Sequence, residues 1–93
     1  MGHAIRMDPE KAAANLRKHG VSFSDAATVF GDPLSHTFFD PDHSATEDRC
    51  ITVGVSRSGT LLVVAHTERG ERVRIISARK PTRTERSYHE NKN

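Results

Sequence analysis

The chain has 93 residues, of which 34% are hydrophobic and none is tryptophan, so it suits one small domain with a modest core. Cys50 is the only cysteine, which excludes an internal disulfide framework and fits a reducing compartment. No apolar run approaches the roughly 18 residues of a membrane span, and no secretory segment is recognisable. We expect one cytoplasmic domain over residues 1–93 that makes no membrane contact, with residues 1–4 disordered or derived from an expression tag.

The net charge of +2 conceals two halves of opposite sign. Residues 1–48 carry four basic and eight acidic side chains, a net of −4, whereas residues 49–93 carry ten basic and four acidic ones, a net of +6. Most of the basic excess is arginine, whose planar guanidinium matches phosphate and stacks on bases. This asymmetry predicts a nucleic-acid contact in the second half.

Two helices are predicted in the first half of the chain. Asp8 caps the first helix, Pro9 fits its first position, and Gly20 ends it in a left-handed conformation. The second helix begins near Ser22 and stops at Gly31-Asp32-Pro33. Both predictions rest on residues that satisfy or interrupt backbone hydrogen bonds at helix ends.

Strands and a third helix are predicted after these two helices. Because the elements come in segregated runs, we expect an α+β fold with a three- to four-stranded antiparallel sheet. The expected strands are 35–40, 50–56, 60–67 and 72–78, with a polar loop over 41–48 and a C-terminal helix from a capping box at 82–85 to about residue 90.

The register of the sheet decides which side chains share a face. Three-residue turns at 57–59 and 69–71 would pair Cys50 with His66 and His66 with Arg74. The face containing Ile51, Val53, Val55, Leu61, Val63, Ala65, Val73 and Ile75 would then be covered by helices. A two-residue second turn would instead place His66 beside Val73 and direct Arg74 to the opposite face from His66.

The segment His66-Thr67-Glu68-Arg69 is the first candidate for chemistry. Cleavage of RNA needs a group that accepts the 2′-hydroxyl proton and cations that stabilise the crowded phosphate. Histidine suits proton transfer near neutral pH, glutamate can also act as a base, and arginine can hold phosphate. A solvated strand end followed by a polar turn is the alternative interpretation.

A run of basic residues is the second candidate. Between residues 69 and 86 there are seven basic and two acidic side chains, a net of +5. Phosphates are the expected target, and a solvated basic face or a dock for an acidic partner are the alternatives. The six histidines lack the spacing of a metal site, so neither a metal nor another cofactor is expected. The basic residues are Arg69, Arg72, Arg74, Arg79, Lys80, Arg83 and Arg86.

Two blocks of the sequence are similar to BrnT-type toxins. The first comprises residues 8–12, 18–23, Asn15, Ala26 and Phe30, and the second Arg49, Gly54, 61–64 and 73–79. The resemblance extends from about residue 5 to residue 88. It implies a RelE-like fold and a ribonuclease that blocks translation. It also implies a BrnA-like antitoxin with a ribbon-helix-helix part, and an operon repressed by the complex, with operator DNA contacted only through the antitoxin.

The resemblance also implies a set of candidate site residues, which are Arg49, His66, Glu68, Arg69, Arg74 and Arg79. One position departs from the family, because Met7 stands where an aromatic residue is usual. Methionine can fill the same apolar gap, so packing would survive the change, whereas stacking on RNA would not.

These observations lead to the hypothesis of a metal-independent endoribonuclease with RNA as substrate. His66, Glu68, Arg74 and Arg79 are the predicted catalytic residues, with His66 or Glu68 moving a proton. A non-catalytic module that binds nucleic acid or a partner through the same basic face is the alternative, and a purely structural subunit awaiting an acidic partner is a third. The predicted RNA-binding residues are Arg49, Arg69, Arg72, Lys80 and Arg83.

Overall fold

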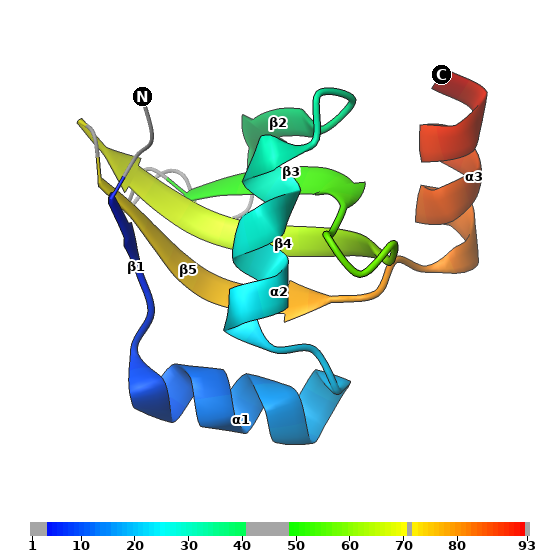
Figure 1. Cartoon of the computed structure of the whole chain (residues 1–93). Coiled ribbons are helices and arrows are strands. Elements are labelled where there is room, and N and C mark those ends of the chain that lie inside the picture. The colour runs from blue at the N-terminus through cyan, green and yellow to red at the C-terminus, as the bar shows by residue number, and fades with distance from the viewer. Residues whose placement is uncertain (1–3, 41–48, 71, 93) are drawn as a thin grey trace.

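The computed structural model describes residues 4–40, 49–70 and 72–92. Within them the expected α+β class is confirmed, but the sheet is five-stranded and mixed rather than wholly antiparallel, with strand order β1-β5-β4-β3-β2. Figure 1 shows α1 below the sheet, α2 across its front and α3 on the far side from β1. The elements are β1 (Ala4–Arg6), α1 (Pro9–His19), α2 (Phe23–Ala27), the 3₁₀ turn η1 (Thr28–Gly31), β2 (His36–Phe39), β3 (Arg49–Val55), β4 (Leu61–Arg69), β5 (Arg72–Arg79) and α3 (Arg83–Lys92).

Three predicted helix ends are confirmed by their hydrogen bonds, whereas the second helix becomes a 3₁₀ turn after Ala27 and only that turn reaches Gly31. Asp8 accepts a bond from the amide of Glu10, and Gly20 adopts φ 70° at the end of α1. The hydroxyl of Ser22 accepts from the amide of Asp25 at 3.0 Å, which caps α2. Short polar side chains at these positions satisfy amides that have no partner within the helix.

Strand β1 was not expected, and it begins at Ala4, within the segment expected to lie outside the fold. It pairs with β5 in parallel, so that Ile5 lies beside Val73. Ile5 is partly buried against the hydrophobic core, whereas Arg6 is exposed. A three-residue strand has no periodicity to reveal it, and its parallel partner lies almost 70 residues away in sequence.

The β3–β4 register agrees with the prediction, including the pairs Val53–Val63 and Cys50–His66. The β4–β5 register does not, because β4 continues to Arg69, which pairs directly with Arg72. The register also shifts between Ala65 and His66, which leaves Ile76 as an extra residue in β5. His66 therefore pairs with Ile75, and neither Arg74 nor Val73 is its partner.

Helices α1, α2 and η1 cover the face opposite to the one expected for β3 and β4. Gly54 explains which face the helices cover, because its missing side chain lets η1 and the segment after it lie close to β3. A Cβ added at Gly54 would lie 2.9 Å from Val29 Cγ1 and 2.8 Å from Ser35 Cβ. Leu61 to Val64 are all apolar, so alternation could not decide between the faces. On β5 the expectation for Val73 and Ile75 was right. The core contains Val21, Phe23, Ala26, Val29, Leu62, Val64, Ile75 and Ala78.

Asn15 fastens α1 to the sheet from inside the core. Its amide nitrogen donates to the carbonyls of Val21 at 3.0 Å and Ala78 at 2.8 Å, and its oxygen accepts from the amide of Ala78 at 3.0 Å. The side chain is 6% exposed, so these bonds form away from solvent, where an unmade hydrogen bond is costly. The helix layer is therefore held to β5 at a defined position.

Candidate functional site: the arginine face of the sheet

The side chain of His66 lies in the helix-covered core and is 0% exposed. Its Nε2 atom lies 2.7 Å from Thr52 Oγ1, which in turn lies 2.7 Å from Thr37 Oγ1. The ring of Phe30 packs edge-on against the imidazole, with ring centroids 4.9 Å apart. His66 is thus a hydrogen-bonded core residue, and in this conformation RNA cannot reach it.

Burial also sets the protonation of His66. It lowers the pKa of the imidazole, and the carboxylate of Glu68 only partly opposes this shift. Nδ1 lies 3.4 Å from Glu68 Oε2, a contact that would be an ion pair only with a protonated ring. Because desolvation dominates and Nδ1 forms no hydrogen bond with a described residue, we assign the imidazole as neutral.

The other face of the sheet, opposite α1 and α2, carries the arginines and is called the arginine face below. Arg74 pairs with Thr67 and lies on this face, whereas the next pair, Ile75 with His66, lies on the other. The expected juxtaposition of His66 and Arg74 is therefore wrong. The two-residue-turn alternative was right about the side of Arg74, although it placed His66 beside the wrong residue.

Three of the predicted arginines share the arginine face at one end of the sheet. Arg72 and Arg74 alternate along β5 and are both exposed. Arg49 is half-buried and pairs with Thr67 across the β3–β4 ladder, so it lies in the same cross-strand row as Arg74. The side chain of Arg69 lies outside the described part of the chain.

Arg79 has a different environment from the other arginines on this face. Its guanidinium binds both carboxylate oxygens of Glu85 at 2.8 and 2.9 Å. This hydrogen bonding, together with the amide of Thr82, lowers the pKa of Glu85 to about 2. Thr82 and Glu85 form the predicted capping box of α3. Arg79 therefore fixes the start of α3, and the structure does not bring it together with Arg74.

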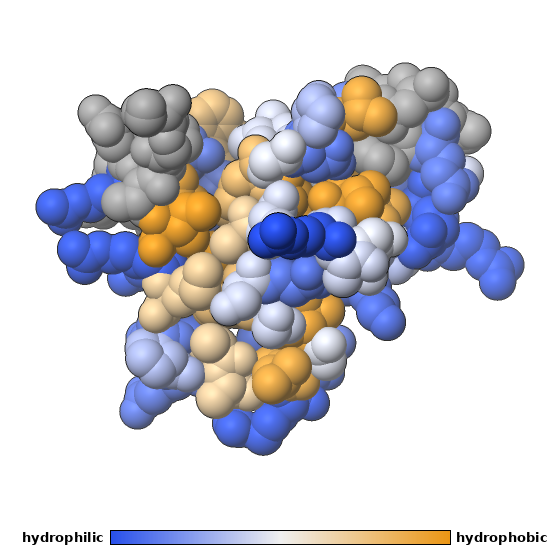
Figure 2. All heavy atoms as spheres, viewed as in Figure 1, coloured by the Kyte–Doolittle hydropathy of each residue, from blue (hydrophilic) through white to orange (hydrophobic). Residues whose placement is uncertain are grey.

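The remaining basic candidates lie beyond the end of β5, toward α3. Lys80 and Arg83 are exposed there, at the opposite end of β5 from Arg72. Arg86 forms an ion pair with Glu90 on α3, with 3.8 Å between Nη1 and Oε2. In Figure 2 the coloured side chains at the place of α3 are mostly hydrophilic. The long basic run of the sequence is thus divided between two ends of the molecule.

Glu68 shares a sheet face with His66, since it pairs with the buried Val73. Its side chain is 45% exposed, so it reaches solvent where His66 does not. The two predicted proton-transfer residues therefore lie across the sheet from Arg74.

Sequence reasoning missed Arg6. Strand β1 brings it beside Arg74 on the arginine face. The alternation of Ile5 and Arg6 was the only local signal, and it spans too few residues to predict a strand.

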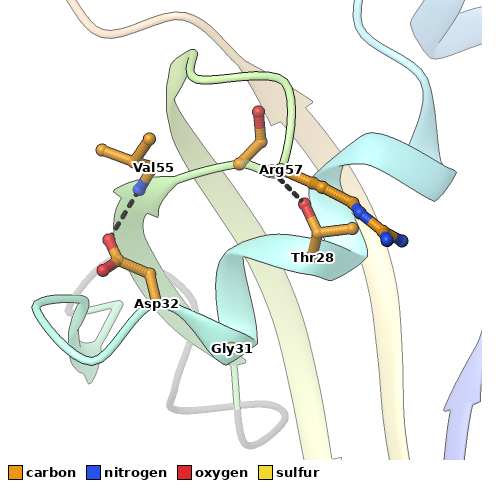
Figure 3. Close-up of a pocket in the computed structure, with 6 residues that line it drawn as sticks. Thr28, Gly31, Asp32, Val55 and Arg57 are labelled. Carbon is orange, nitrogen blue, oxygen red and sulfur yellow. Dashed lines mark hydrogen bonds between the residues drawn. The ribbon is translucent and has the colours of Figure 1, made fainter.

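A pocket between η1 and the β3–β4 hairpin is lined by Thr28, Gly31, Asp32, Val55, Ser56 and Arg57. Figure 3 shows that two of its side chains point at the hairpin backbone. Asp32 Oδ2 accepts from the amide of Val55 at 2.8 Å, and Thr28 Oγ1 accepts from that of Arg57 at 2.7 Å. These groups hold the hairpin in place, which makes the pocket part of the scaffold.

Within the described residues, no three His, Cys, Asp or Glu side chains are arranged to hold a metal ion. The same part of the chain contains no helix with the length and apolar character needed to cross a membrane.

Comparison with known proteins identifies the class of this domain. The family model of the ribonuclease toxin BrnT of type II toxin–antitoxin systems matches residues 7–85. The crystal structure of the Brucella abortus ribonuclease toxin BrnT superposes with a TM-score of 0.68 at 21% identity, covering 87% of this chain and 99% of that one. No curated protein matches the chain.

Fold and site define a small α+β domain with one face of its mixed sheet covered by helices and the other carrying arginines. The chain belongs to the BrnT family of ribonuclease toxins from type II toxin–antitoxin systems, as the resemblance implied. An antitoxin partner follows from that membership.

Proposed function

We propose that this chain is an endoribonuclease toxin that binds the phosphates of RNA on its arginine face. The observation that carries the proposal is the cross-strand row joining Arg49 and Arg74 through Thr67. Arg72 extends this basic surface along β5. Guanidinium groups offer paired donors in the geometry of phosphate oxygens, so such a cluster favours an RNA backbone.

The proposed reaction is attack of a ribose 2′-hydroxyl on the adjacent phosphorus. The bond from phosphorus to the 5′-oxygen breaks, and the leaving oxygen takes a proton from water, giving a 2′,3′-cyclic phosphate and a 5′-hydroxyl. Arg74 would stabilise the negative charge that builds on the phosphate oxygens. Of the two predicted proton acceptors only Glu68 reaches solvent, since its side chain is 45% exposed and that of His66 is 0% exposed. Glu68 lies across the sheet from Arg74, so the arginine face supplies the phosphate contacts but not the proton acceptor. Arginines take the electrostatic role in this scheme, so we expect cleavage to persist in EDTA.

Expression in bacteria, combined with sequencing of RNA ends, tests this proposal. The wild-type chain should arrest growth and produce ends carrying cyclic phosphate. Arg74→Ala should abolish both effects, while Arg17→Ala should leave them intact, because Arg17 is exposed on α1 in the helix layer. Growth arrest without new RNA ends would contradict ribonuclease activity.

One observation favours a second candidate function, a non-catalytic module that binds RNA or a partner. Neither His66 nor Glu68 lies on the face that carries Arg74. A binding module needs the arginines but no proton acceptor. Glu68→Gln separates the two functions, since it should abolish cleavage by an enzyme that uses this base and leave toxicity by binding alone unchanged.

We infer that the antitoxin is BrnA-like, with a ribbon-helix-helix part that carries the complex to operator DNA. Family membership supports a toxin–antitoxin pair. A toxin that cleaves translated RNA acts in the cytoplasm, which is where we place the complex. Co-expression with such an antitoxin should restore growth and yield a stable complex on purification.

A further inference from the structure

The parallel pairing of β1 with β5 fixes the direction of Arg6. Ile5 packs against the core beside Val73, which is 4% exposed. Because successive side chains of a strand alternate between faces, Arg6 is directed to the arginine face. Its partner across the ladder is Arg74, and both residues are exposed.

Arg6 therefore completes a row across four strands, in the order Arg6, Arg74, Thr67 and Arg49. Neighbouring strands lie about 4.8 Å apart, so the row is roughly 14 Å long. A strip of this length can meet more than one phosphate of a single RNA strand.

The pairing of Arg6 with Arg74 is unfavourable in the free protein. Like charges directly opposite each other on neighbouring strands destabilise a sheet. Among the described residues, no acidic side chain forms an ion pair with either arginine, whereas Arg79 and Arg86 pair with Glu85 and Glu90. Anions bound at the two guanidinium groups would relieve this repulsion.

We propose that Arg6 binds an RNA phosphate adjacent to the one held by Arg74, with the RNA strand running across the β-strands. This inference rests on the proposed function and adds β1 to its binding surface. Each phosphate contact of a single strand contributes about 0.7 to the slope of log affinity against log salt concentration. The contribution of Arg6 can therefore be measured separately.

The test is the affinity of the full chain for a single-stranded 2′-O-methyl RNA, which lacks the attacking hydroxyl, measured over a series of KCl concentrations. Arg6→Ala should weaken binding roughly tenfold and reduce the slope by about 0.7. Arg6→Lys should retain the slope because it retains the charge. Arg17→Ala is the control and should match the wild type, and circular dichroism should show all variants folded.

An unchanged slope in Arg6→Ala with a reduced slope in Arg74→Ala would overturn the role of Arg6 and leave the proposed function standing. Unchanged slopes in both variants, with RNA still bound, would overturn the arginine face itself. Weakened antitoxin binding with unaltered RNA binding in Arg6→Ala would show that β1 serves the partner protein, which also overturns this proposal.

Discussion

Arg74 and His66 lie on opposite faces of the sheet. Arg74 pairs with Thr67 on the arginine face, and His66 pairs with Ile75 in the helix-covered core. The two side chains are only eight positions apart in sequence, yet the sheet separates them. A phosphate held by Arg74 is therefore out of reach of the buried imidazole, and the two residues must have different roles.

His66→Gln should lower stability without weakening RNA binding. Glutamine can still hydrogen-bond to Thr52, but it loses the edge contact with Phe30, so we expect a loss of about 1–2 kcal/mol in the free energy of unfolding. Urea denaturation measures this loss, and RNA affinity is measured on the folded variant. A large fall in affinity with unchanged stability would instead place His66 in the RNA site.

Stability should fall when the pH is lowered through the titration range of unfolded histidine. Because burial lowers the pKa of His66, the unfolded chain, with a value near 6.5, binds this proton more tightly than the folded protein. The contribution of the neutral imidazole is complete above about pH 6.5 and decreases below it. Melting temperatures at pH 8 and pH 5.5 should differ more for the wild type than for His66→Gln, and equal differences would contradict this assignment.

Asn15→Ala should destabilise the fold strongly. It leaves the amide and carbonyl of Ala78 without their buried partners, which costs about 2–4 kcal/mol. Leu16→Ala is a matched control on the same helix, because Leu16 is 52% exposed. Denaturation that gives similar losses for both variants would show that Asn15 is dispensable for docking α1.

Glu85→Gln should loosen α3 while leaving the rest of the domain intact. The Arg79–Glu85 pair is more than one-third exposed, so its contribution is at most about 1 kcal/mol. That contribution is present above pH 4.5 and is lost as the pH falls toward the pKa of Glu85, about 2. Hydrogen exchange should be faster in α3 of this variant. Glu90→Gln should show little change, because the ion pair of Glu90 with Arg86 is longer. Equally faster exchange in both variants would contradict the role of the Arg79–Glu85 pair in holding α3.

Local signals in the sequence predicted the helix starts and the first hairpin well, but not the second turn. Asp8, Gly20 and Gly59 act through their own backbone and nearest neighbours, and Gly59 has φ 86° at the end of the turn over 57–59. Strand β1 and the shift at His66 depend on contacts between distant segments. In an apolar run such as Leu61 to Val64, either set of alternating side chains could face the helices. The packing of η1 against β3 decides which set does.

The placement of the candidate residues was predicted in part. Alternation along a strand is enough to place Arg72 and Arg74 on one face, and the structure has them there. The sequence predicted Glu85 as part of the α3 capping box but did not show that the same carboxylate also binds Arg79. The role proposed for Arg79 could therefore not be judged from sequence. Arg6 was missed because its significance depends on a parallel pairing that no local pattern encodes.

The most direct measurement of the central claim is NMR of arginine Nε–Hε groups during titration with 2′-O-methyl RNA. These groups report side-chain contacts individually and distinguish the two layers of the domain. We predict that the signals of Arg49, Arg72 and Arg74 shift with added RNA, while that of Arg17 on α1 stays in place. Shifts confined to Arg17 or to the arginines of α3, with Arg74 unmoved, would contradict RNA binding at the arginine face.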